Sequence, residues 1–240
     1  MTLLIDADYI LYKSAAYCET EIDFGEDLIV VQSKFSDLQR MLEWEFKQIT
    51  TTLASDDLIL FFSDSINFRK DIYPDYKGHR NRKKPCGYKR AINWLRESYK
   101  VEVMPTLEAD DAMGIFATKN LGHTIVSPDK DMRQIPGSLY DLKEHLTITL
   151  EQGSRWHLIQ TLSGDQTDGY AGCPGIGIKR AETLFEKYGE SWLTVVAAYE
   201  RAELTEADAL MNARLAKILT VDDYDFTTAS PILWTPSSDL

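Results

Sequence analysis

Short continuous apolar runs recur along this chain, and each one ends in polar residues. The clearest runs cover residues 2–6, 57–64 and 123–129. Unbroken apolar runs of this length are typical of strands that are buried on both faces of a parallel sheet. We therefore expect three neighbouring core strands from these segments. Residues 28–31 form a shorter run that predicts a further strand, of the kind found in a hairpin.

Between the apolar runs, hydrophobic side chains recur at helical spacing. Residues 35–53 carry the longest stripe, and residues 88–99 and 109–121 carry shorter ones. Strands that alternate with helices predict an α/β fold with a mostly parallel central sheet flanked by helices. Helices are also expected near 190–202 and 205–220. The acidic segment 19–27 fits none of these patterns, and we expect it to form a surface loop or an excursion from the body.

Each of the three core runs leads into an aspartate, namely Asp6, Asp64 or Asp129. The carboxyl ends of parallel strands lie along one edge of the sheet and form its ligand crevice. Any single one of these acids could be a helix N-cap. Three acids at equivalent strand ends favour a shared site, and Asp8 is an optional further member that could instead cap a turn.

Additional carboxylates follow in short clusters near residues 108–111, 129–131 and 165–168. Taken singly, they could be first-turn helix acids or ordinary polar turns. Together with the strand-end acids they would repel one another strongly, and Lys130 is the only lysine inside these motifs. Oxygen donors without His or Cys suit hard divalent cations, so we expect two Mg²⁺ or Mn²⁺ ions, which can clamp both oxygens of a phosphodiester displacement. The cluster acids are Glu108, Asp110, Asp111, Asp131, Asp165 and Asp168.

Basic residues are concentrated in one window, although the chain of 240 residues has a net charge of −12. Residues 69–100 hold eleven of the 26 Lys and Arg against three acids, which gives this window +8 and leaves −20 for the rest. A solvated helix face is the plain alternative, but such faces normally mix both signs. The window predicts a phosphate-contacting segment, in which tyrosines such as Tyr76 could stack on unpaired bases.

The stretch from Gly172 to Ala181, GCPGIGIKRA, has the form of a helix-hairpin-helix. Its glycines permit a tight turn and close approach to a phosphate, and the helix that follows presents free N–H groups. Such an element binds a duplex backbone without reading bases. A Gly-rich loop between packed helices is the alternative. The expected DNA contacts here are Gly175, Gly177, Lys179 and Arg180, and the hairpin carbonyls could also hold K⁺.

Six motifs in this order resemble the 5′-nuclease superfamily, which includes flap endonucleases and the 5′-nuclease domain of bacterial DNA polymerase I. The likeness is greatest to the stand-alone 5′→3′ exonucleases of short-tailed phages. The motifs are LLIDAD at 3–8, FSDSINFR at 62–69, YKGHR at 76–80, EADD at 108–111, SPDKD at 127–131, and the 164–181 segment. The resemblance implies a PIN-like core over 1–150, with a basic arch at 69–100. It also implies a helix-three-turn-helix (helix-hairpin-helix) subdomain over 151–240.

The resemblance also assigns roles to residues. Asp6, Asp64, Glu108 and Asp110 would hold the first metal region. Asp111, Asp129, Asp131, Asp165 and Asp168 would hold the second. Arg69 and Lys77 would contact the scissile phosphate and offset charge that develops during hydrolysis. The residues expected to guide the DNA strand are Tyr76, His79, Arg80, Arg82, Lys83, Lys84, Lys89 and Arg90.

The arch departs from the family pattern, because only eleven residues separate Tyr76 from Tyr88 and both Pro85 and Gly87 interrupt a helix. This favours action on 5′ ends of duplex DNA over threading of long flaps, with flaps and RNA–DNA hybrids as further substrates. A PIN-type ribonuclease is the competing enzyme class, and the hairpin at 172–181 argues against it. A DNA-binding module with a decayed site is the non-enzymatic alternative, against which the full acidic set argues.

The rest of the sequence bears on where in the cell the protein is expected to act. No apolar run reaches the length of a membrane span, and no basic-then-apolar leader opens the sequence, so we expect neither a membrane partner nor secretion. The three cysteines are far apart, which fits a reducing compartment and argues against a structural zinc site. A monomer in the cytoplasm, or in the host cytoplasm for a phage protein, is the expected form.

Overall fold

A six-stranded sheet forms the centre of the molecule, in the order β5-β4-β1-β6-β7-β8. The computed structural model describes residues 1–80, 83–120 and 122–236. All neighbouring strands are parallel except β7 and β8, which form an antiparallel edge. The predicted α/β class with a mostly parallel sheet is confirmed. The strands are β1 (Thr2–Asp6), β4 (Leu58–Phe61), β5 (Val101–Glu102), β6 (His123–Val126), β7 (Gly137–Tyr140) and β8 (His145–Ile148).

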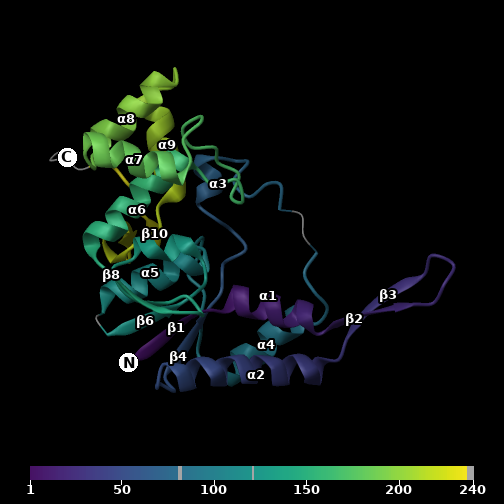
Figure 1. Cartoon of the computed structure of the whole chain (residues 1–240). Helices are drawn as coiled ribbons and strands as arrows, with labels where there is room; N and C mark the ends of the chain where they lie inside the picture. Colours follow the sequence, from purple (N-terminus) through teal and green to yellow (C-terminus); the bar gives the residue numbers. More distant parts are fainter. Residues whose placement is uncertain (81–82, 121, 237–240) are drawn as a thin grey trace.

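Helices cover both faces of this sheet (Figure 1). On one face Leu3 and Ile5 pack with α1 (Ala7–Tyr17), α2 (Phe35–Thr52) and α4 (Tyr88–Ser98). On the other face Leu4 packs with α5 (Ala109–Lys119). Because successive strand residues point to opposite faces, one apolar run supplies both layers of the core. The expected helices at 35–53 and 88–99 are confirmed, and so is the helix from 109, as far as it lies within the described residues.

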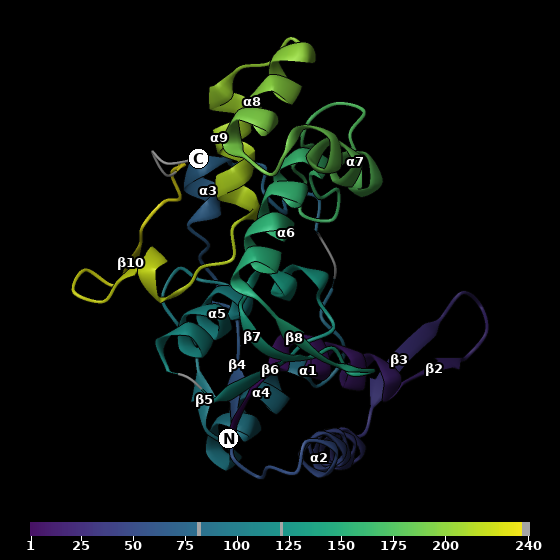
Figure 2. The same ribbon diagram turned by 60° about the vertical axis from the view of Figure 1, so that its left-hand side comes forward.

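Four helices form a second apolar core beside the sheet (Figure 2). This second core contains Leu162, Phe185, Val195 and Ala213, one from each helix. The division predicted at residue 150 coincides with the start of α6, but as a domain boundary it stays a prediction. The four helices are α6 (Leu150–Ser163), α7 (Ile178–Tyr188), α8 (Trp192–Arg201) and α9 (Glu206–Ala216).

Smaller elements complete the described chain. The four-residue helix α3 (Arg69–Ile72) precedes the arch, and α4 begins at Tyr88, with Gly87 in the left-handed region at φ +79°. Among the described residues between α3 and α4 there is no helix, as Pro85 and Gly87 predicted. The other elements are the 3₁₀ helices η1 (Lys130–Gln134) and η2 (Val221–Asp223) and the paired strands β9 (Tyr224–Asp225) and β10 (Ser230–Pro231).

An antiparallel hairpin projects from the body between α1 and α2 (Figure 1). It consists of β2 (Glu19–Asp23) and β3 (Ile29–Ser33), joined by a turn in which Gly25, Glu26 and Asp27 all have positive φ. The strand expected at 28–31 is therefore confirmed. Residues 19–27 form the excursion that was one of the two expectations for this segment. The alternative of a loop is wrong for residues 19–23, because the alternating acids face solvent on a two-stranded ribbon that needs no buried face. No described helix has both the length and the apolar character that a membrane span requires.

Candidate active site

A cleft of about 870 Å³ lies where β1, β4 and β6 reach their carboxyl ends. The strand-end acids Asp6, Asp64 and Asp129 all line it. Five of the six cluster acids line it as well, so segments far apart in the sequence meet at one edge of the sheet. These five are Glu108, Asp110, Asp131, Asp165 and Asp168.

Three of the acids, Asp6, Asp110 and Asp129, form a group that is not directly paired with a cation among the described residues. Asp6 accepts hydrogen bonds from the Tyr9 amide (3.0 Å) and the Ser127 hydroxyl (2.9 Å). Burial and repulsion from Asp8 and Asp129 nevertheless raise the pKa of Asp6 to about 6. Burial and the charges of Asp6 and Asp129 raise the pKa of Asp110 well above its ordinary range. In the described chain, none of these three acids takes part in an ion pair within 4.0 Å.

A second group of acids is held by cations. Lys130 pairs with Asp165 at 2.6 Å and with Asp131 at 3.5 Å. The Gln160 amide donates a further hydrogen bond to Asp131 at 2.6 Å. Burial and the neighbouring Asp129 still raise the pKa of Asp131 to about 7. The negative charge of Asp131 is thus only partly offset by Lys130. The contact with Lys130 does help to lower the pKa of Asp165, although burial of Asp165 acts in the opposite direction.

The arch reaches into the same cleft. Lys77 pairs with Glu108 at 2.5 Å and with Asp168 at 3.5 Å, and its amide donates to the Asp168 carbonyl at 2.8 Å. Arg80 pairs with Asp168 at 2.6 Å. Sequence pattern did not show these two pairings, because the fold brings Arg80 beside an acid 88 residues away and Lys77 beside one 31 residues away.

Within the described residues, no three Asp, Glu, His or Cys side chains enclose a preformed metal cage. The acids are instead distributed along the cleft in the two groups above. Asp129 lies with Asp6 and Asp110, although the resemblance placed it in the other metal region. The first group offers carboxylate oxygens that have no ion-pair partner within 4.0 Å in the described chain, and a divalent cation would neutralise it.

Three predicted site residues have a different role in the structure. Arg69 is fully buried and forms a bidentate ion pair with Asp111, which is also fully buried. Arg69 lies in the wall of the cleft with its guanidinium engaged by Asp111, and both Asp111 oxygens accept hydrogen bonds from within the protein. Tyr76 is 1% exposed and its hydroxyl lies 3.0 Å from Glu108 and 2.9 Å from Asp168. A buried ring of this kind cannot stack on a terminal base.

Asp64 and Asp8 lie at the other wall of the cleft. Asp64 accepts backbone hydrogen bonds from Ser65 and Thr106, which lower its pKa. Asp8 accepts from the Ser63 amide at 2.7 Å and the Tyr88 hydroxyl at 3.1 Å. Asp8 lies within α1, whose N-cap is Asp6, so it is not a cap. It lines the cleft and ties the start of α4 to the residues that follow β4.

The predicted strand-guiding residues divide into two sets. A hollow of about 470 Å³ beside the cleft is lined by His79, Arg80 and Lys84, together with Tyr12. Lys83 is exposed close to them. Lys89 and Arg90 line neither hollow, and the Arg90 guanidinium lies 4.2 Å from the centre of the Phe35 ring on the α2 side. Arg82 lies outside the described residues.

The predicted hairpin at 172–177 joins α6 to α7 beside the acids at 165 and 168. Gly164 and Gly172 close the base of this loop: a Cβ on Gly172 would lie 2.2 Å from the Gly164 nitrogen, and both have positive φ. Only glycine fits either position. Gly175 also has positive φ, and its carbonyl accepts a hydrogen bond from Arg180 at 2.6 Å.

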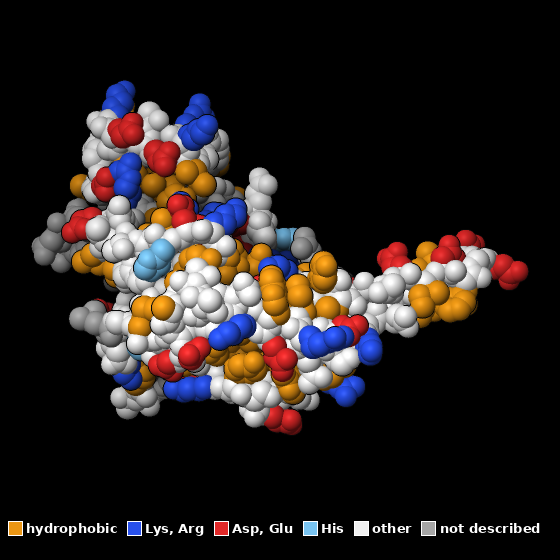
Figure 3. Space-filling model, turned by 60° about the horizontal axis from the view of Figure 1, so that its bottom comes forward, with side chains coloured by type: hydrophobic (Ala, Val, Ile, Leu, Met, Phe, Trp, Pro, Cys, Tyr) orange, Lys and Arg blue, Asp and Glu red, His pale blue; other side chains and the backbone are white. Residues whose placement is uncertain are grey.

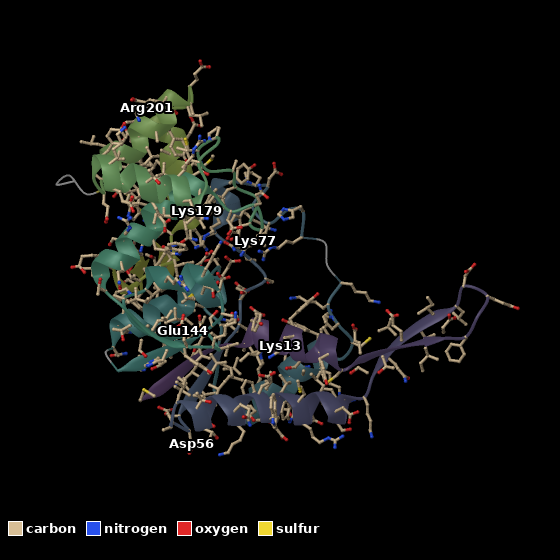
Figure 4. The ribbon with its side chains drawn as sticks, in the orientation of Figure 1. Lys13, Asp56, Lys77, Glu144, Lys179 and Arg201 are labelled. Atoms are coloured by element: carbon tan, nitrogen blue, oxygen red, sulfur yellow. The ribbon has the colours of Figure 1, made fainter. Side chains whose placement is uncertain are left out.

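The N–H groups of the first turn of α7 follow Gly177. A Cβ added to Gly177 would meet no atom within 4 Å, so the space beside this turn is open. Lys179 is exposed there, and Figure 4 shows it in the part of the helical region that lies toward Lys77. Sequence reasoning missed three supporting groups, Ser63, Ser127 and Gln160. Ser63 and Ser127 follow core strands beside an aspartate, which was an available signal, whereas nothing marked Gln160 within α6.

The site is an acidic cleft at the carboxyl edge of a parallel sheet. Cations of the arch enter it, and a glycine hairpin lies beside it. Together these features define a nuclease. Residues 1–153 match the family described as 5′-3′ exonuclease, N-terminal resolvase-like domain, and the chain belongs to this family. Over 98% of this chain and 93% of each relative, it is 28% identical to the exodeoxyribonuclease of Enterobacteria phage T3 and 28% identical to the exonuclease of Escherichia phage T7.

Solved structures share the fold at low sequence identity. The D15 protein of bacteriophage T5, co-crystallised with metal ions, aligns with a TM-score of 0.66 and 13% identity over 90% of this chain and 89% of that one. The catalytic core of Rad2 in complex with DNA substrate aligns with a TM-score of 0.55 and 11% identity, over 84% of this chain and 64% of that one. The predicted superfamily and the enzyme class, a phosphodiesterase acting as a nuclease, are confirmed.

Proposed function

We propose that the protein is a divalent-metal-dependent 5′→3′ exonuclease that hydrolyses phosphodiester bonds at the 5′ ends of duplex DNA. The observation that carries this proposal is the uncompensated group Asp6, Asp110 and Asp129 at the end of the cleft. Its support from outside the chain is the family, the two phage relatives, and the metal ions and DNA named for the structures that share the fold.

Asp6, Asp110 and Asp129 would hold one Mg²⁺ or Mn²⁺ ion. Asp131, Asp165 and Asp168 would supply donors for a second, directly or through water, with Asp64 and Glu108 at the margins. When bound, such ions supply Lewis-acid stabilisation of the phosphodiester and a nucleophile derived from water at neutral pH. The donor set fits them, since it consists of oxygen alone.

The chain's own residues would position the substrate. Lys77 lies at the cleft between Glu108 and Asp168, where an ammonium can contact a phosphate and offset negative charge that builds up on it. His79, Arg80, Lys83 and Lys84 line or border the hollow beside it and would guide the 5′-terminal strand. We propose Lys77 as the one protein cation that acts on the scissile phosphate, because Arg69 is committed to Asp111.

The glycine hairpin and the first turn of α7 would hold the duplex backbone. Gly175, Gly177, Lys179 and Arg180 contribute backbone N–H groups and positive charge, which bind phosphates without regard to sequence. Carbonyls of the same hairpin are the proposed K⁺ site. The short arch favours ends over threaded flaps, and we place flaps and RNA–DNA hybrids as secondary substrates. The proposed setting is the cytoplasm of a bacterial host, as for the phage relatives.

Cleavage of defined substrates tests this function. The protein is incubated with 5′-labelled blunt duplex, nicked duplex, 5′ flap and closed circular single strand, in Mg²⁺ or in EDTA. We expect short 5′ products from duplex ends in Mg²⁺ alone, and no cutting of the closed circle. An Asp110→Asn variant is the matched control and should be inactive. Failure of the wild type to cut any substrate in Mg²⁺ or Mn²⁺ would overturn the proposal.

A further inference from the structure

The projecting hairpin has one apolar face that nothing covers. Ile22 is paired with Val30, and the Phe24 amide donates to the Leu28 carbonyl, so these four side chains lie on the same face of the ribbon. Phe24 is 64% exposed and Leu28 is 56% exposed. A contiguous exposed apolar face of this kind marks an interaction surface more often than a scatter of single apolar residues does.

The rest of the hairpin is acidic. Residues 19–33 contain five acids and neither lysine nor arginine. Glu19, Glu21 and Asp23 alternate along the other face of β2, and Glu26 and Asp27 form the tip. Figure 3 shows acidic and hydrophobic side chains together on this projection. Phosphates would be repelled by a segment of charge −5, so the hairpin suits a partner with positive charge around an apolar surface.

The chain itself carries a surface with that chemistry. A groove of about 450 Å³ lies between α7 and α8, and Ile176, Leu184 and Ala198 provide apolar lining. The exposed Tyr188 ring borders it, with the Lys187 ammonium 4.9 Å and the Arg201 guanidinium 5.4 Å from the ring centre. No acid lines the groove among the described residues. Its three cations are Arg180, Lys187 and Arg201.

Hairpin and groove cannot meet within one molecule. In both Figure 1 and Figure 2 the hairpin projects from the sheet end, whereas α8 lies at the opposite end of the helical region. Figure 4 places Arg201 at that far end, away from Lys77 and the cleft. The two complementary surfaces are therefore free to be used between copies without covering the acidic cleft.

We propose that the β2–β3 hairpin of one copy docks in the α7–α8 groove of a second copy. The apolar face formed by Ile22, Phe24, Leu28 and Val30 would cover the groove lining, and the acids of the hairpin would face Lys187 and Arg201. This contact does not depend on the proposed exonuclease function. It differs from the monomer that the sequence favoured.

The contact is heterologous, since a different surface is used on each copy. After one such contact forms, each copy still has one unused surface, a hairpin or a groove. Further copies can therefore add, which produces open chains, or rings where the chain closes on itself. A single hairpin offers less than the roughly 800 Å² per partner of a standard stable interface, so the association should be weak and visible at about 10–100 µM protein. Screening by salt should weaken it further.

Sedimentation velocity tests the proposal directly, with the full chain at 5–200 µM and no DNA. We expect the weight-average mass to rise with concentration in 50 mM NaCl and to rise less in 500 mM NaCl. The double variant Phe24→Ser/Leu28→Ser and the double variant Lys187→Glu/Arg201→Glu should each remain monomeric. Trp44→Ser, which removes an exposed apolar side chain outside both surfaces, is the matched control and should associate like the wild type.

Mixing the two double variants gives the decisive result. One variant keeps its groove and the other keeps its hairpin, so one contact can form, and the mixture should give 1:1 dimers and nothing larger. Circular dichroism and thermal unfolding report that each variant is folded. A wild type that stays monomeric at 200 µM in low salt would overturn the proposal. Association that survives in either double variant alone, or a mixture that stays monomeric, would overturn it as well.

Discussion

Arg69 donates hydrogen bonds to both oxygens of Asp111, at 2.6 and 2.8 Å, and both side chains are fully buried. The same guanidinium donates to the backbone carbonyls of Leu215 and Lys217 at the end of α9. One side chain thus joins the start of the arch, the helix that carries Asp110, and the last helix of the helical region. Its role is to hold these elements together beside the cleft.

Replacement of Arg69 by Met should therefore destabilise the protein by about 3–5 kcal/mol, because it leaves a buried carboxylate without its partner. Urea unfolding measures the loss, and Lys70→Met, an exposed neighbour, should cost less than about 0.5 kcal/mol. The double variant Arg69→Met/Asp111→Asn should lose less than the sum of the single changes. Unchanged stability with reduced turnover would instead make Arg69 a phosphate contact.

Lys77→Ala should reduce kcat on duplex ends by roughly 100-fold or more, since this cation is proposed to offset charge on the reacting phosphate. Binding of the same duplex in EDTA, measured by fluorescence anisotropy, should change much less than turnover. Lys83→Ala removes an exposed arch cation and serves as the comparison, with an effect mainly on binding. Equal losses of kcat in the two variants would contradict a specific role for Lys77.

Asp131→Asn should abolish cleavage and leave DNA binding largely intact. Burial and the charge of Asp129 raise the pKa of Asp131 to about 7, so at pH 8 its charge destabilises the metal-free fold. The variant should accordingly be more stable than the wild type in EDTA, by about 2–4 kcal/mol. Thermal unfolding in EDTA and in 10 mM Mg²⁺ checks this, and the gain from Mg²⁺ should be smaller in the variant. A larger Mg²⁺ gain in the variant would contradict the metal assignment.

Replacing both Lys179 and Arg180 with Ala should weaken duplex binding and reduce the slope of log Kd against log [NaCl] by about 2, because each lost phosphate contact removes roughly 0.9. Anisotropy titrations in EDTA at several salt concentrations measure the slope. Lys119→Ala is the control, since Lys119 lies over the Phe226 ring at 4.1 Å, outside the residues that line the cleft. A slope that stays the same would show that the hairpin does not hold the duplex.

His157 should make stability depend on pH. Burial and the nearby charge of Lys217 lower its pKa to about 4, although its Nε2–H donates to the Ala213 carbonyl at 2.8 Å. The unfolded chain takes up this proton near pH 6.5 and the folded chain only near pH 4, so stability falls as the pH drops through that window, by up to about 3 kcal/mol. His157→Gln, which keeps an amide donor, should lose this part of the dependence. The free energy of unfolding of both proteins, measured by urea from pH 4 to pH 7, checks this. An identical pH dependence in the wild type and the variant would contradict the role of His157.

The three core strands could be predicted because the information that specifies them is local. Runs such as Leu3-Leu4-Ile5 are apolar on both faces, and an acid at the end of each run marks the sheet edge. The strands β5, β7 and β8 were missed, since they have only two to four residues and no continuous apolar run of their own. The strand β2 was missed because its acids face solvent.

The roles of individual site residues were harder to predict, because they depend on contacts between distant segments. Arg69 is 146 residues from Leu215, whose carbonyl it binds, and nothing near Arg69 in the sequence shows that its guanidinium is buried. Tyr76 was assigned to a base for the same reason, although its hydroxyl lies between Glu108 and Asp168. Sequence pattern locates the acids of the cleft well, but which cations neutralise them is decided by tertiary packing.

The glycine pair Gly164–Gly172 closes a loop that carries Asp165 and Asp168 and continues directly into the hairpin proposed to bind phosphate. In the proposed function, the distance from the bound duplex backbone to the bond that is cut is therefore set by main-chain geometry over a few residues. Side-chain substitutions can change how fast such an enzyme works, but the register of its cut is built into the backbone. Altering that register would require inserting or deleting residues between Gly164 and Gly177.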